Sequence, residues 1–227
     1  MSVTTIRSVL LSGYTQRIHF ELPGIPVAIA AGEFVEIAQL LVEPASRREG
    51  QIAVEVNPDL GHHAMYRHQS NTLLVPRPDF PTTLPEEALL IHEAVHIHND
   101  KNGVPLPWDE DEMLAYVAQM LYLQVADPIT YGGLAAVRDA QLQRAGIDVD
   151  AEAVRDMMGV ETNISGARDL AVERHAADVA SAIYSSRTPT GEQLFELRAA
   201  IRQHPAYVDL PVDYETGEAS HRHYGGL

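Results

Sequence analysis

The stretch from Thr83 to Gly103 constrains the fold of this chain more than any other segment, because it carries both helix boundaries and a chemical motif. Thr83 followed by Glu86 matches a helix capping box, and Pro85 falls in the first turn, where a missing N–H group costs little. Asn102-Gly103 is a typical end of a helix. We therefore expect a helix that begins at Thr83, runs to about residue 100 and stops at Asn102-Gly103.

The sequence His92-Glu93-Ala94-Val95-His96 lies inside this expected helix. Residues four positions apart on a helix differ by only about 40° in rotation, so both imidazoles project from one face. Two imidazole nitrogens, each about 2.0–2.1 Å from the ion, supply half of a tetrahedral zinc site. Glu93 lies one residue further round and can take a proton from a water that zinc has acidified. The segment predicts zinc ligation by His92 and His96, with Glu93 as the general base.

An ordinary helix is the competing interpretation, in which the two histidines are buried or exposed without a metal. The motif would then be accidental, and the chain would be a helical interaction module. The metal content of protein purified without a histidine tag separates these two interpretations.

Composition excludes several other classes of protein. The formal net charge of −16 argues against nucleic acid as a partner, because phosphate binding needs clustered Lys and Arg. The absence of cysteine excludes disulfides and cysteine-based zinc sites. We expect no membrane span, since there is no apolar run of about 18 residues. Residues 1–20 lack the apolar core of a secretory signal, which favours a cytoplasmic protein, with signal-less export as the alternative.

The first third of the chain reads as short strands with one helix. Extended patterns cover residues 6–22, with Gly13 as a turn, and residues 51–56 and 71–75, while a helical pattern covers residues 32–42. Pro76 and Pro78 follow the run at 71–75, which favours an edge strand.

Helical patterns dominate the rest of the chain. Beyond the motif helix, we expect helices near residues 109–126, 134–145, 150–158, 165–185 and 191–203. A small sheet followed by a helical majority is an α+β arrangement. We expect a single domain over residues 1–209, with the sheet in about 1–80 and the helices in about 83–209, and a loose tail at 210–227.

The segment from Tyr66 to Gln124 resembles the zincin metallopeptidases: a strand at 71–75, an HExxH helix and then an acidic helix. The resemblance implies a zincin-like fold in which the strand at 71–75 is the edge strand that lines the substrate cleft. It also implies a bound Zn²⁺ and hydrolysis of a peptide or protein substrate. A zincin-like domain without peptidase activity, which binds a partner or modifies another substrate, is the alternative.

The third zinc ligand distinguishes the subclasses of zincin. The metzincin pattern needs Gly at position 99 and His at position 102, and both are Asn here. The gluzincin pattern takes a Glu from the following helix, which matches Glu112, with the small residues Ala115 and Ala118 on the same side. Glu112 could instead form a capping box with Asp109. The alternative ligands are Asp111, Glu110, His175 and Asp178.

Three further residues are candidates for roles beside the metal. His175 or Tyr131 could stabilise an oxyanion, as residues outside the motif do in many zincins. Tyr116 lies one turn after Glu112 and could support the site as a hydrogen-bond donor.

His98 is expected to face another surface, because it lies about 200° round the helix from His96. His62, His63 and His68 are expected in a solvated loop.

Overall fold

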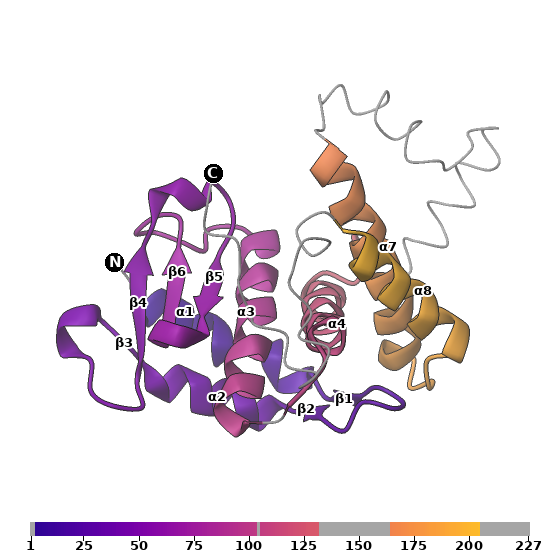
Figure 1. The fold of residues 1–227 in the computed structure, drawn as a ribbon, viewed down its shortest axis with the longest axis horizontal. Coiled ribbons are helices and arrows are strands. Elements are labelled where there is room, and N and C mark those ends of the chain that lie inside the picture. Colours follow the sequence, from indigo (N-terminus) through magenta and orange to yellow (C-terminus); the bar gives the residue numbers. More distant parts are fainter. Residues whose placement is uncertain (1–2, 104, 132–163, 205–227) are drawn as a thin grey trace.

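The computed structural model describes residues 3–103, 105–131 and 164–204, which form an α+β fold (Figure 1). These residues contain six α-helices and two small sheets, and helices fill the C-terminal half. The predicted α+β arrangement is therefore confirmed. The helices expected at residues 134–145 and 150–158, and the tail at 210–227, lie outside the described residues.

The structure corrects the prediction that residues 6–22 are extended with a turn at Gly13. The chain begins with helix α1 (Val3–Leu10) and continues through a 3₁₀ turn (Thr15–Arg17). Strand β1 (Phe20–Glu21) is short and pairs antiparallel with β2 (Ala28–Ile29). The buried side chains of α1 recur every three or four residues, which is the helical period, and this spacing outweighs the β-branched composition of the segment.

Helix α2 (Ala31–Leu40) and strand β4 (Ile52–Val56) form where the sequence predicts a helix and a strand. The main sheet also contains β3 (Leu41–Val42), β5 (Met65–Arg67) and β6 (Thr72–Val75). Its strand order is β3-β4-β6-β5, and β5 alone runs antiparallel to its neighbour.

The prediction that residues 71–75 form an edge strand is wrong. Strand β6 lies between β4 and β5, and all four of its side chains are buried. Pro76 and Pro78 come after the strand, so they remove no hydrogen bond from its ladder. The edge strands are β3 and β5, and β5 packs against the helix that follows the sheet.

Helix α3 (Leu84–Asn102) has the predicted boundaries. The Thr83 hydroxyl accepts a hydrogen bond from the Glu86 N–H at 3.4 Å, and Gly103 ends the helix in the left-handed conformation at φ 59°. Without a side chain, glycine adopts this conformation at little cost.

Helix α4 (Trp108–Ala126) packs against α3 in the antiparallel direction. Glu87 contacts Tyr122, and His96, two turns further along α3, contacts Asp111 near the start of α4. Ala115 and Ala118 are completely buried, so small side chains allow the two helices to approach closely.

The two remaining helices cover α4 from the side opposite α3 (Figure 1). These are α7 (Ile164–Tyr184) and α8 (Gly191–Gln203), both close to their predicted bounds. Among the described residues, none of the helices combines the length and apolar character needed to cross a membrane.

The Glu86 carboxylate accepts hydrogen bonds from residues that precede α3. In a capping box it would instead accept one from the N–H of the N-cap residue. It accepts hydrogen bonds from the Thr82 N–H at 2.8 Å and from the Arg77 guanidinium at 2.6 and 2.7 Å. Burial raises the pKa of Glu86, but the hydrogen bonds from Arg77 and Thr82 outweigh it and lower the pKa from 4.5 to about 2. Ionised Glu86 therefore stabilises the folded state.

This pKa shift predicts a pH-dependent contribution to stability. A depressed folded-state pKa gives stabilisation that is complete above the ordinary value of 4.5 and is lost as the pH falls through about 2. At neutral pH we expect Glu86→Gln to lower the free energy of unfolding by on the order of 1 kcal/mol, measured by denaturant titration. The difference from wild type should shrink between pH 4.5 and pH 2. Glu36→Gln, on an exposed residue of α2, is the control, and a constant difference for Glu86→Gln would contradict this account.

Candidate metal centre between α3 and α4

The two motif histidines point from α3 toward α4, as the helical spacing predicts. Their ring centroids are 4.9 Å apart, and both residues are buried. Glu112 reaches them from α4: its Oε2 is 3.4 Å from His92 Nε2, and its Oε1 is 3.7 Å from His96 Nε2. Glu112 therefore faces both histidines across the helical pair.

The spacing of these three donors fits a metal ion. Ligand atoms at 2.0–2.1 Å from a tetrahedral ion lie about 3.3 Å from one another. One donor atom from each of His92, His96 and Glu112 lies within 4.8 Å of the others. Small movements of the side chains would bring such a set to bonding distance. The triad could thus hold a metal ion.

The hydrogen-bond partners of the two imidazoles determine which nitrogen of each ring faces Glu112. His96 Nδ1 lies 2.8 Å from Asp111 Oδ2, and His92 Nδ1 lies 3.1 Å from Gln119 Oε1. Both partners are acceptors, so each Nδ1 donates its proton to them, and each Nε2 faces Glu112 as the nitrogen that could bind a metal in place of a proton. This is the tautomer in which histidine binds a metal, and such orienting partners raise the basicity of the ligand.

Each orienting residue is itself held in place. Asn99 donates to the second oxygen of Asp111, and Asn99 lies on α3 one turn after His96. The Gln119 amide nitrogen donates to Glu173 on α7 at 3.3 Å, which fixes the amide oxygen toward His92. The triad is therefore supported from α3, α4 and α7.

The electrostatic environment of His96 favours a positive charge. Burial lowers the pKa of its imidazole, but the carboxylates of Asp111, Glu112 and Glu93 raise it well above the usual value. The same attraction keeps the pKa of Asp111 low despite its burial. A cation bound at Nε2 would satisfy these buried carboxylates as a proton does.

Glu93 projects from α3 toward the edge of the sheet. Its Oε2 accepts a hydrogen bond from the Tyr66 main-chain N–H at 2.7 Å. The Tyr66 hydroxyl donates toward Asp100 Oδ2 at 2.6 Å, and it lies 2.8 Å from Asn71 Oδ1. Strand β5 is thus attached to α3 at Glu93 and again two turns later at Asp100.

Of the other residues considered from the sequence, one contacts His92 and the rest lie elsewhere. The ring of Tyr116 meets the ring of His92 edge to face, with centroids 4.6 Å apart. His175 instead lies 3.5 Å from Glu196 of α8, and Tyr131 packs against the hydrophobic core. His98 pairs with Glu33 of α2 at 3.0 Å, so it faces away from the triad as expected.

The acidic residues before Glu112 do not cap the helix. Helix α4 has Pro107 at its N-cap position and no side-chain cap, so the alternative in which Glu112 forms a capping box with Asp109 is wrong. Asp109 and Glu110 instead pair with arginines of α8. Asp111, considered from the sequence as an alternative ligand, contacts the Nδ1 side of His96.

Sequence reasoning did not identify Gln119, Asn99 or Tyr66 as parts of the site. Gln119 lies two turns after Glu112 on α4, and Asn99 lies one turn after His96 on α3. Helical spacing from the ligands could therefore have suggested these two residues. The role of Tyr66 depends on its main-chain N–H, which side-chain identity does not reveal.

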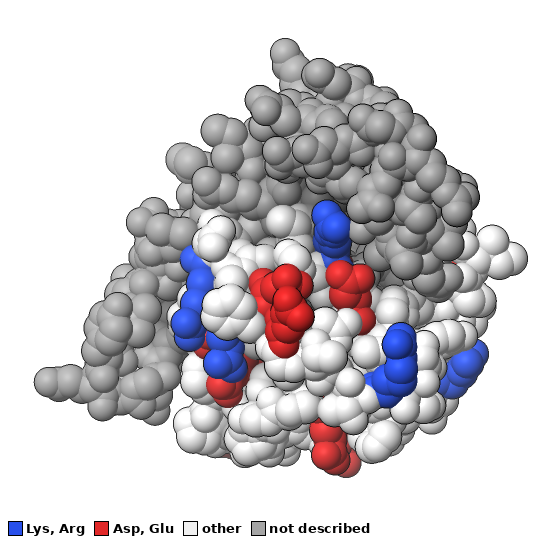
Figure 2. Space-filling model, turned by 90° about the vertical axis from the view of Figure 1, so that its right-hand side faces the viewer, with Lys and Arg blue, Asp and Glu red and all other residues white. Residues whose placement is uncertain are grey.

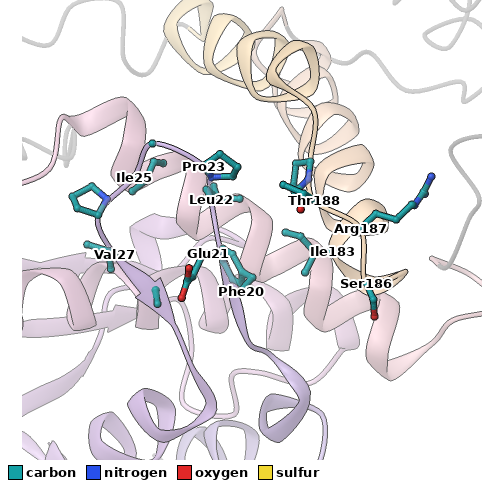
Figure 3. Close-up of a pocket in the computed structure, with 14 residues that line it drawn as sticks. Phe20, Glu21, Leu22, Pro23, Ile25, Val27, Ile183, Ser186, Arg187 and Thr188 are labelled. Carbon is teal, nitrogen blue, oxygen red and sulfur yellow. The ribbon is translucent and has the colours of Figure 1, made fainter.

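A surface hollow of about 690 Å³ lies apart from the triad (Figure 3). It is formed by residues 20–28, which include β1 and β2, and by residues at the end of α7 and in the connection to α8. None of the residues predicted from the sequence to form the site lines it.

Comparisons with protein-family models, with curated proteins and with solved structures found no match for this chain. They assign no role to His92, His96 or Glu112. The properties that bear on function are the donor atoms, the burial and the orienting partners of these residues. All three properties are those of a potential metal site between α3 and α4.

The geometry predicts different effects for neighbouring carboxylates. Glu112→Gln replaces a proposed ligand with a neutral amide, whereas Asp111→Asn changes only the group that orients His96. Loss of an orienting group weakens metal binding by roughly 10–100-fold, and we expect Glu112→Gln to weaken Zn²⁺ binding further. Glu36→Gln should bind as wild type does. Competition with a chromophoric chelator measures all three affinities, and wild-type affinity in Glu112→Gln would exclude this residue as a ligand.

Proposed function

We propose that this protein is a zinc-dependent hydrolase that cleaves peptide bonds. The observation that carries the proposal is the buried triad of His92, His96 and Glu112, with Glu93 on the same turn of α3 as His92. Two histidines and one carboxylate form the protein ligand set of several catalytic zinc sites, where a water or substrate takes the fourth position.

The ligand types favour zinc among the common divalent ions. Calcium and magnesium prefer sets made entirely of oxygen ligands, whereas two imidazole nitrogens with one carboxylate suit zinc. The orienting contacts from Asp111 and Gln119 support the same choice, because zinc-bound histidines usually donate their other N–H to such acceptors.

The proposed chemistry assigns a separate task to each group. Zinc, when bound, would polarise the scissile carbonyl and lower the pKa of a water toward neutrality. Glu93 Oε2 is held by the Tyr66 N–H, so we assign Oε1 as the atom that takes the proton from the attacking water. Glu93 would then return this proton to the leaving amine. His92, His96 and Glu112 hold the reaction centre in a fixed position.

The arrangement supports a zincin-like enzyme of the gluzincin type. The third proposed ligand comes from the helix after the motif helix, and an antiparallel edge strand lies beside that motif helix. Under this proposal the strand that lines the substrate cleft is β5, not β6. The hydrogen bond from its Tyr66 N–H to Glu93, the proposed base, supports this assignment.

The first test is the metal content of native, untagged protein. We expect about one zinc per chain, and His92→Ala/His96→Ala should lose it, because only one of the three proposed protein ligands would remain. Elemental analysis of the folded proteins gives the stoichiometry. Stoichiometric zinc in the double variant would show that the metal lies elsewhere.

The second test separates an enzyme from a zincin-like binding module. Glu93→Gln keeps the size of the side chain and can still accept the Tyr66 N–H, but it cannot take a proton. We expect zinc to stay bound while cleavage of a generic unfolded protein substrate falls by a factor of about 10² or more. An unchanged rate in this variant would contradict the assigned mechanism. Zinc binding without cleavage by wild type of any of a broad set of peptides would favour the binding module.

A further inference from the structure

The segment from Asp109 to Glu112 places four consecutive carboxylates at the start of α4. The structure divides them into two pairs that face different helices. Asp111 and Glu112 turn toward the histidines of α3, and Asp109 and Glu110 turn toward α8. The same turn of α4 therefore serves both the proposed metal site and a contact with α8.

Two arginines of α8 form that contact. Arg202 donates to Asp109 Oδ2 from Nε at 2.8 Å and from Nη2 at 2.6 Å. Arg198 lies one turn earlier on the same face, with Nη2 at 2.7 Å from Glu110 Oε1 and Nε at 3.5 Å from Asp109 Oδ2. The Asp109 side chain is only 2% exposed, so these two arginines take the place of the water that would contact a surface carboxylate.

We propose that Arg198 and Arg202 are positioning residues for the metal site, an inference that rests on the proposed function of that site. By holding Asp109 and Glu110, they fix the rotation of α4 about its axis and so aim Asp111 and Glu112 at the histidines. Neither arginine touches the triad. Their effect passes through the backbone of one helical turn.

The geometry of a helix makes this rotation important. At a radius of about 6 Å, a rotation of about 20° moves the end of a side chain by about 2 Å. Metal–ligand distances tolerate deviations of only about 0.2 Å. Helix α4 has no side-chain cap at its N-terminus, so no cap of its own holds this turn. The ion pairs with α8 supply the restraint at this end of the helix.

The face that carries α7 and α8 shows acidic and basic side chains close together (Figure 2).

General electrostatic attraction for a cation and specific positioning of the ligands predict opposite effects on zinc affinity when the arginines are removed. Loss of two positive charges from a chain of net charge −16 increases its general attraction for a cation. Loss of positioning lowers the affinity for the metal. The direction of the change therefore distinguishes the two effects.

The test compares Arg198→Gln/Arg202→Gln with a charge-matched control in the full chain. Zinc affinity is measured by competition with a chromophoric chelator, and circular dichroism verifies that each variant is folded. We expect the α8 variant to bind zinc about tenfold more weakly than wild type, or weaker still. The control, Arg48→Gln/Arg187→Gln, changes two exposed arginines. It should bind as tightly as wild type or slightly more tightly.

A double-mutant cycle separates positioning from general stabilisation. Asp109→Asn and Arg202→Gln break the same ion pair, so each should weaken zinc binding and the double variant should be little worse than either. Arg198→Lys/Arg202→Lys keeps the charge without the planar donor pair and should restore part of the affinity. If the glutamine variant does not fold, Arg202→Lys decides the question, because it should still bind zinc more weakly than wild type.

The outcomes also distinguish this inference from the proposed function. If wild type takes up no zinc, the proposed metal site is wrong. If wild type binds zinc and Arg198→Gln/Arg202→Gln binds it equally well or more tightly, only the positioning role is overturned. Equal weakening in the control, or independent effects in the cycle, would also overturn it.

Discussion

The antiparallel packing of α3 and α4 is the contact on which the rest of the structure depends. Small side chains such as Ala115 and Ala118 bring the helices close, and the same interface buries two histidines and several carboxylates. Buried charges are costly unless they are paired, and the desolvation of each must be offset by a specific partner. The contacts of His96 with Asp111, and of Asp111 with Asn99, provide such partners. A metal ion in the triad would compensate the remaining negative charge, so stability and metal binding are expected to be linked.

The acidic start of α4 couples this interface to the C-terminal helices. Four adjacent carboxylates repel one another, and the positive end of the helix dipole offsets only part of that repulsion. Arginines of α8 neutralise the outer pair, while His96 faces the inner pair. Helix α7 contributes through Glu173, which holds the Gln119 amide beside His92. Helices distant in sequence from the motif thus contact the residues that lie beside the two histidines.

Local signals explain which parts of the fold were predictable from the sequence. Thr83 and Gly103 mark the two ends of α3 by short-range chemistry, and the spacing of His92 and His96 fixes their common face. The errors occur where tertiary packing decides. Residues 6–22 carry β-branched side chains, yet α1 buries a helical face, and β6 lies inside the sheet because β5 folds back beside it. Glu112 could be named as a candidate partner of the two histidines from its position on the next helix. Tyr66 could not, because its main-chain N–H contacts Glu93 only after the edge of the sheet meets α3.

These contacts also bear on whether the motif is accidental. Buried imidazoles need hydrogen-bond partners on any helix, but this need gives no reason for a carboxylate of another helix to face both Nε2 atoms. Such a helix would equally give no reason for the intervening glutamate to meet a main-chain donor at the sheet edge. These features come from β5, α3 and α4, whose relative positions the five-residue motif does not set. Their agreement on one buried point supports a metal site more strongly than the motif does, because each could have failed independently of the others.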